Sequence, residues 1–180
     1  QELTVIDARH PLLYLQNLKS SKKTIPLSLQ LNGKQRMIVI SGPNAGGKTI
    51  ALKTIGLLQL MLQSGLLIPV SEASVYSFFD KILVDIGDTQ SIENELSTYS
   101  AKLVSMTHIL NNANEKTLVL LDEFGSGTDP ELGSAVAEAV LENLVESKTR
   151  GVITSHFGNI KLLTDKLEGA VNEIGRASCR

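Results

Sequence analysis

The chain has 180 residues and a formal net charge of −2, with 42% hydrophobic, 20% charged and 4% aromatic residues. These values fit one soluble domain with an aliphatic core. The net charge shows no surplus of basic residues that would indicate nucleic-acid binding. The single cysteine, Cys179, excludes a disulfide within the chain. The sequence predicts neither a signal peptide nor a membrane span, so we expect a cytoplasmic protein without a membrane partner.

The two ends of the chain read as cut ends. It opens at Gln1 rather than Met, and its last segment, EIGRASCR, has no apolar period. We therefore expect a domain from a longer protein, with residues 1–172 as the domain. Residues 173–180 are expected to be a tail that is either foreign to the protein or a frayed terminus.

Short apolar runs alternate with helical patterns along the chain. We expect strands over 3–6, 25–31, 36–41, 75–79, 81–86, 117–121 and 151–154, and helices over 47–64, 97–113, 130–146 and 160–167. The polar and basic residues 15–24 predict an exposed loop. Asp129 and Pro130 are expected to begin the helix that follows them, as N-cap and first helical residue. The alternation indicates an α/β fold, with a mostly parallel central sheet flanked by helices and a short N-terminal antiparallel β part. Ligands of such sheets bind at the carboxyl ends of the strands.

The stretch GPNAGGKT at residues 42–49 lies between an expected strand and an expected helix, and it fits G-x-x-x-x-G-K-[ST] at every position. Glycines let backbone N–H groups approach a polyphosphate closely, and the following helix adds free N–H groups and its positive dipole end. Lys48 would place its ammonium on the β- and γ-phosphates, and the Thr49 hydroxyl would ligate Mg²⁺. The alternative, a glycine turn with a solvated lysine, is disfavoured by the flanking elements. The predicted nucleotide-binding residues here are Gly42, Pro43, Asn44, Ala45, Gly46, Gly47, Lys48, Thr49 and Ile50.

Two acidic residues, Asp122 and Glu123, directly follow the apolar run at 117–121. At the carboxyl end of a strand beside the phosphate loop, Asp122 would hold Mg²⁺ and Glu123 would orient and polarise the attacking water. An acidic pair after a strand is often only a solvated strand end. The prediction therefore depends on its combination with the phosphate loop.

Two further positions are weaker candidates. His156 follows the expected strand at 151–154 and could hydrogen-bond the γ-phosphate, although a lone histidine is as often structural. The serine at the start of the 97–113 helix either caps that helix or marks a second anion site at its free N–H groups.

These stretches together resemble the ATPase domain of MutS-family proteins, part of the ABC-ATPase class. The resemblance covers residues 7–161 and rests on GPNAGGKT, STYS, LLDEFGSGTDP and TSH. The segments DIGDTQSIENELSTYSAKL and DEFGSGTDPELG are most similar to the second MutS branch, MutS-two. Repair MutS proteins typically have Met where this chain has Ala45, and Phe-Met where it has Tyr99 and Ser100.

The resemblance implies a P-loop NTPase of the ABC-ATPase type that binds ATP and Mg²⁺ and hydrolyses ATP, with Lys48, Glu123 and His156 as catalytic residues. It makes His156 the switch histidine. It also implies a homodimer with composite sites, in which Ser97 and Ser100 reach the γ-phosphate bound by the partner subunit.

The resemblance implies three further assignments. It gives residues 125–129 to a loop that communicates between the two sites, and it places Gln90 in a region like the Q-loop. It puts His10, within the stretch 9–11, near the adenine. The whole protein would act as a nucleotide-gated dimeric clamp on branched or mismatched DNA, or on stalled ribosomes. The family's domain extends further past the switch histidine than this chain does, so we expect weak hydrolysis by the isolated chain.

Three functions remain open at this point. The first is a Mg²⁺-dependent ATPase of a MutS-like DNA mismatch repair or recombination protein. The second is a nucleotide-binding clamp module with negligible turnover. The third is an ATPase of another ABC branch, such as a transporter or a chromosome-structure protein, although the sequence lacks the LSGGQ signature of those branches. A small-molecule kinase is disfavoured because the sequence contains no arginine-rich lid segment.

Overall fold

The structure, a computed structural model, describes residues 2–42, 47–87 and 95–174. Its strands are β1 (Leu3–Ala8), β2 (Leu27–Leu31), β3 (Met37–Ser41), β4 (Lys81–Asp85), β5 (Thr117–Leu121), β6 (Arg150–Ser155) and β7 (Ala170–Ile174). Its helices are α1 (Pro11–Lys19), α2 (Lys48–Gln63), α3 (Glu95–Asn112), α4 (Pro130–Glu146) and α5 (Gly158–Thr164). None of the helices within the described residues is long and apolar enough to cross a membrane.

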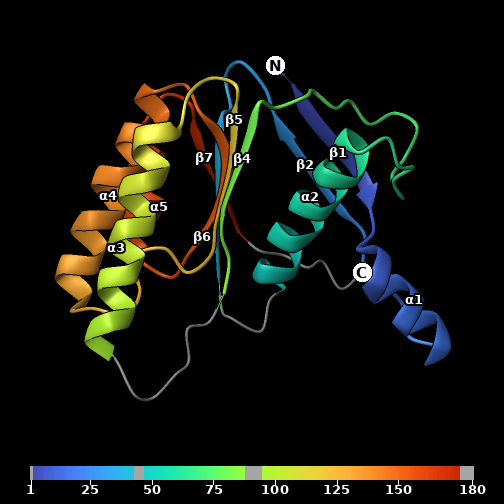
Figure 1. Cartoon of the computed structure of the whole chain (residues 1–180), viewed down its shortest axis with the longest axis horizontal. Helices are drawn as coiled ribbons and strands as arrows, with labels where there is room; N and C mark the ends of the chain where they lie inside the picture. The colour runs from blue at the N-terminus through green and yellow to red at the C-terminus, as the bar shows by residue number, and fades with distance from the viewer. Residues whose placement is uncertain (1, 43–46, 88–94, 175–180) are drawn as a thin grey trace.

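Five strands form one parallel sheet in the order β4-β5-β6-β3-β7, and β1 and β2 form a separate antiparallel pair. Figure 1 shows α3, α4 and α5 on one face of the large sheet, and α2 with the β1–β2 pair on the other. This arrangement confirms the predicted α/β fold with its mostly parallel sheet and its short antiparallel part. Because neighbouring strands of the large sheet run parallel, their carboxyl ends meet at one edge.

The large sheet is buried on both faces. In β3, Met37 and Val39 belong to the core shared with α3, α4 and α5, whereas Ile38 and Ile40 belong to the core shared with α2, β1 and β2. All five residues of β5 are buried, and its four aliphatic residues divide between the same two cores. A strand that is covered on both sides has no polar face, which explains its continuous apolar sequence.

The strand predicted over 75–79 is wrong. Only its first residue pairs in a strand-like way, through a single bridge to β1. Two side-chain amides of α2 hold the rest of the segment. Gln59 donates to the carbonyl of Ser77 at 2.9 Å, while Gln63 donates to the carbonyl of Phe79 at 3.1 Å and accepts from its N–H at 3.0 Å. The helix thus satisfies backbone groups that a neighbouring strand would otherwise pair.

The loop predicted over 15–24 is wrong for its first half, because α1 runs through it. His10 begins this helix: its Nδ1 accepts from the N–H of Leu13 at 3.4 Å, and a proline fills the first helical position. No residue of α1 is buried. Figure 1 shows the helix extending away from both sheets.

Strand β7 is absent from the sequence-based prediction. It pairs in parallel with β3 alone and forms an edge of the sheet. Its central residues include Asn172 and Glu173, which are poor strand formers, so the pattern gives little signal. The strand contains residues 173 and 174, which were predicted to belong to the tail; residues 175–180 lie outside the described residues. The other predicted elements are confirmed, with ends that differ by up to a few residues.

Candidate functional site

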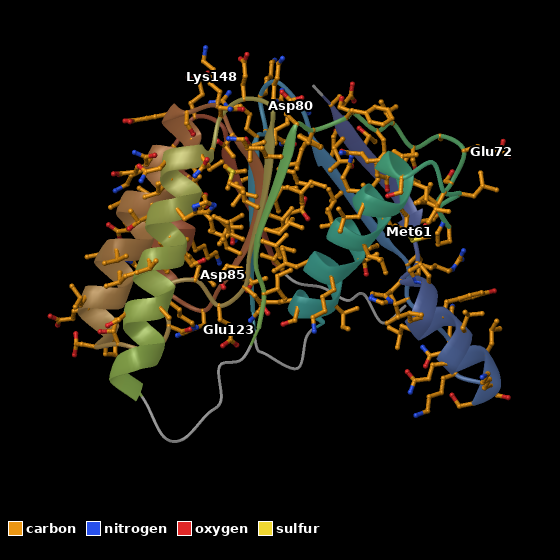
Figure 2. The ribbon with its side chains drawn as sticks, in the orientation of Figure 1. Met61, Glu72, Asp80, Asp85, Glu123 and Lys148 are labelled. Atoms are coloured by element: carbon orange, nitrogen blue, oxygen red, sulfur yellow. The ribbon has the colours of Figure 1, made fainter. Side chains whose placement is uncertain are left out.

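The predicted motifs meet at the carboxyl edge of the large sheet. Gly42 follows β3, Asp122 follows β5 and His156 follows β6. The Asp122 N–H donates to the carbonyl of Asp85 at 2.9 Å, which extends the pairing of β4 and β5 by one step. Figure 2 shows Asp85 and Glu123 at this edge, and Asp80 and Lys148 at the opposite one.

The N-terminus of α2, the positive end of its dipole, also lies at this edge, and its N-cap residue Gly47 provides no side-chain cap. The helix begins at Lys48, after Gly47 in the left-handed region with φ 79°, and its first turn contains no acidic residue. The Lys48 side chain is only 3% exposed, and its Nζ donates to the carbonyl of Gly42. A buried ammonium at the positive end of a helix dipole is a suitable site for an anion such as a phosphate. Residues 43–46 of the predicted loop lie outside the described residues.

Two threonines hold the carboxylate of Asp122, one at each oxygen. The Thr49 hydroxyl, on the first turn of α2, donates to Oδ2 at 2.7 Å. The Thr154 hydroxyl, on β6, donates to Oδ1 at 2.5 Å. The phosphate-loop helix, the acidic strand end and the neighbouring strand are therefore joined at a single carboxylate.

Glu123 has an unusual backbone conformation. Its φ is 46°, in the left-handed region that a glutamate rarely adopts. Its N–H donates to the Thr154 hydroxyl at 2.8 Å, and its carbonyl accepts from the N–H of Ser126 at 3.1 Å. The Glu123 side chain is partly exposed, and no described residue donates a hydrogen bond to its carboxylate. Such local strain is often found at functional sites, where the surrounding structure maintains it.

The loop after Glu123 packs tightly on α4. A Cβ on Gly125 would lie 2.5 Å from the carbonyl oxygen of Gly133 and 2.9 Å from the ring of Phe157, so both glycines are needed for this close approach. Asp129 caps α4 as predicted, with Oδ1 accepting from the N–H of Glu131 at 3.0 Å. The loop is thereby fixed at both of its ends.

A lysine of α3 contacts the same loop. Lys102 Nζ donates to Ser126 Oγ at 2.9 Å. Because α3 also carries Ser97 and Ser100, the helix that contains the STYS stretch is joined to the loop that follows Glu123. The side chain of Ser97 lies outside what the structure describes, and Ser100 is exposed.

Within the part of the chain that the structure describes, no hydrogen bond joins the remaining predicted site residues to the acidic pair. His156 is exposed and its ring lies 4.4 Å from that of Phe157, and no described contact joins it to Asp122 or Glu123. Ile50, in the first turn of α2, is 41% exposed. His10 caps α1, and Gln90 lies outside the described residues.

The donor set at this edge fits a magnesium–nucleotide complex. A threonine hydroxyl and one aspartate are hard oxygen donors beside the N-terminus of α2. Within the described residues, no group of three or more histidine, cysteine or acidic side chains could hold a metal by itself. Mg²⁺ commonly binds in this way, through one or two protein oxygens together with substrate phosphates.

Sequence reasoning missed two of the residues that organise the site. Thr154 and Lys102 belong to motifs it had singled out, but no role was assigned to either. The position of Thr154 at a strand end, two residues before His156, was the available signal.

Comparisons with known proteins agree with this geometry. The family model described as MutS domain V matches residues 38–177. The chain is 48% identical over 162 residues to a protein named Endonuclease MutS2 from Finegoldia magna, which covers 89% of this chain and 20% of that protein. Proteins of the same name from Gemmatimonas aurantiaca and Clostridium botulinum are 46% and 44% identical over 168 residues, or 93% of this chain and 20% and 21% of theirs. The chain thus spans about a fifth of the length of these relatives. The chain belongs to the MutS family, in which it corresponds to domain V, the ATPase domain.

Proposed function

We propose that this chain binds ATP with Mg²⁺ and hydrolyses the terminal phosphoanhydride bond. The observation that carries the proposal is the 2.7 Å bond from Thr49 to Asp122, which joins the phosphate-binding helix to the acidic strand end. Family membership supports the same activity. The anion-binding end of α2 supplies the place for the phosphates.

Each residue of the site has a proposed role. Lys48 binds the β- and γ-phosphates, and Thr49 and Asp122 hold the metal ion, which neutralises phosphate charge when bound. Glu123 orients the attacking water and accepts its proton. His156 contacts the γ-phosphate as a switch, a role that requires its exposed ring to turn toward the acidic pair.

The proposal extends to an assembly. Ser97 and Ser100 would contact the nucleotide bound by a second subunit, which makes each site a product of two chains. In the whole protein, ATP binding would close a dimeric clamp around branched or mismatched DNA, or on a stalled ribosome. The word endonuclease names the relatives' activity; for this chain we propose the ATPase part alone.

A second candidate is a nucleotide-binding module with negligible turnover. The exposed position of His156, without a contact to Glu123 among the described residues, favours it for the isolated chain. The two candidates differ in turnover per subunit and agree on binding.

The test is phosphate release from Mg²⁺-ATP at rising protein concentration, with light scattering on the same samples. A rate per subunit that climbs as dimers form supports the composite ATPase. Tight binding with negligible turnover at every concentration supports the second candidate. Absence of nucleotide binding contradicts both.

Two variants locate the activity. Lys48→Ala is expected to weaken nucleotide binding more than about tenfold, or about 1.4 kcal/mol, whereas Glu123→Gln keeps binding and loses turnover about 10²-fold or more. Lys53→Ala, on the exposed side of α2, and Glu142→Gln, exposed on α4, are the matched controls. Equal turnover by Glu123→Gln and the parent would remove Glu123 from the mechanism.

A further inference from the structure

We propose that Thr154 is a positioning residue for ATP hydrolysis, one that sets the carboxylate of Asp122 and the backbone of Glu123 with a single hydroxyl group. This inference rests on the function proposed above. It concerns a side chain that the phosphate-loop and acidic-pair motifs do not include.

The hydroxyl of Thr154 has one proton and two acceptor lone pairs. The Glu123 N–H donates to this oxygen at 2.8 Å, so the oxygen acts as an acceptor there. Its own proton is directed to Asp122 Oδ1, at 2.5 Å. This short distance is typical of a hydroxyl that donates to an ionised carboxylate. The two bonds form a chain from the Glu123 amide through the hydroxyl to the Asp122 carboxylate.

The position of Thr154 leaves its hydroxyl little freedom. The residue is fully buried, and it lies in β6, where it pairs in register with Ile40 of β3. Its carbonyl also accepts from the N–H of Phe124 at 3.1 Å. Thr154 therefore accepts hydrogen bonds from two successive backbone N–H groups of the turn in which Glu123 adopts φ 46°.

Loss of this hydroxyl would release both acidic residues. Asp122 would keep Thr49 as a donor at Oδ2 but would lose the hydroxyl that donates to Oδ1, so its carboxylate would be held less firmly about the Cβ–Cγ bond. The strained turn at Glu123 would lose one of the bonds that maintain it. A displacement of a reacting group by about 1 Å can cost about 100-fold in rate. We therefore expect the turnover number to fall about 10- to 100-fold, with a smaller change in the KM for ATP.

The alternative is that the hydroxyl only satisfies buried polar groups. Thr117 provides a matched control. It is also fully buried, and it begins β5, at the end of the strand opposite to Asp122. Its hydroxyl accepts from the N–H of Asn114 at 3.1 Å and donates to Asn114 Oδ1 at 3.2 Å. Removing this hydroxyl also deletes one bond from a backbone N–H and one bond to a side-chain oxygen, here a neutral amide, at a distance from the site.

The experiment compares Thr154→Val, Thr154→Ser and Thr117→Val with the parent chain. The readouts are kcat and KM for Mg²⁺-ATP, the Mg²⁺ concentration for half-maximal binding of a fluorescent ADP analogue, and hydrogen exchange of the Glu123 amide without nucleotide. We expect Thr154→Val to lose turnover, to require several-fold more Mg²⁺ and to expose the Glu123 amide to exchange. Thr154→Ser should stay within about twofold of the parent in kcat because it keeps the hydroxyl. If Thr154→Val does not fold, Thr154→Cys replaces it, with similar volume and a weak donor.

Each outcome decides a separate question. If Thr154→Val turns over ATP like the parent, or Thr117→Val loses as much as Thr154→Val, the positioning role is wrong while the ATPase proposal stands. If Thr154→Ser is as impaired as Thr154→Val, the hydroxyl is not the cause and the role is again wrong. If the parent itself binds nucleotide and shows no turnover, the ATPase proposal fails and this inference fails with it.

Discussion

The close contact between α4 and the loop after Glu123 allows a prediction about stability. In the Gly133→Ala variant, a gain in helix propensity opposes a steric overlap, and the size of both effects can be given. Gly133→Ala places a methyl group in the first part of α4, where alanine is a better helix former than glycine by about 1 kcal/mol. That methyl would lie well inside contact distance of the Gly125 carbonyl oxygen and 3.1 Å from Thr128 Cγ2. The nearest atom belongs to backbone, which cannot turn aside as a side chain can.

The steric term is expected to exceed the helix-propensity term. The loop must move by about 1 Å to reach an ordinary contact distance, and overpacking of this kind costs about 3 kcal/mol. The net loss in the free energy of unfolding is then about 2 kcal/mol, or about 4–8 °C in Tm for a chain of this size.

Two other glycine-to-alanine variants calibrate the measurement by urea and thermal unfolding. Gly158→Ala, at the start of α5, has no atom within 4 Å of the new methyl and should be neutral or slightly stabilising. Gly56→Ala meets only the end of the Leu120 side chain, at 2.8 Å, so an intermediate loss is expected. A Gly133→Ala protein at least as stable as the parent, with an unchanged urea m-value, would refute the reasoning.

Two further predictions concern side chains outside the acidic pair. Burial raises the pKa of Tyr76 to about 12 from its ordinary value of 10.0. The stabilisation that depends on its neutral phenol is therefore complete below pH 10 and is lost as the pH rises through about 12. The parent should lose free energy of unfolding relative to Tyr76→Phe across that window, and parallel curves would contradict the assignment. For the 2.9 Å bond between Lys102 and Ser126, a double-mutant cycle with Lys102→Met and Ser126→Ala should give a coupling energy of about 1 kcal/mol. Strict additivity of the two variants would show that α3 is not joined to the loop.

The parallel sheet could be predicted because its central strands are buried on both faces. A segment such as β5 is then apolar at nearly every position, and a short apolar run between turn signals is consistent with a buried strand. The acidic pair and the phosphate loop could be placed at one edge for a related reason, since each directly follows such a strand. What the pattern could not supply was the strand order. The bond between Thr154 and Asp122 depends on β6 lying beside β5, and nothing local to either strand encodes that.

The three errors in secondary structure have separate physical causes. Helix α1 has no buried residue, so its leucines give no amphipathic stripe facing a core. Strand β7 lies at an edge and pairs on one side only, which permits polar residues that dilute its pattern. The segment 75–79 is apolar enough for a strand, but Gln59 and Gln63 of α2 bind its backbone. In each case the secondary structure depends on how the segment packs against distant parts of the chain, which its local sequence pattern does not reveal.

The left-handed backbone of Glu123 was also beyond the reach of the sequence. A glycine in the sequence would have suggested a positive φ at this position. A glutamate gives no such signal, because it adopts a positive φ only where neighbouring groups hold it there. The close approach of Gly125 and Gly133 is visible only once α4 is packed on the loop. Its signal was two glycines flanking the capped start of the helix.

The place of β3 in the sheet has a consequence for the order in which the protein folds. Residue 37 of this strand pairs with residues 151 and 170, so both neighbours of β3 lie near the far end of the described chain. During synthesis, strand β3 with its four buried apolar residues emerges before either of its partners. Both of its edges stay unpaired until β6 has left the ribosome. Pairings so distant in the chain are slow to form, because a long loop has to close before they contribute any stability. A nascent chain that ends before β6 therefore exposes an apolar strand with two open edges, a surface suited to chaperones and prone to aggregation.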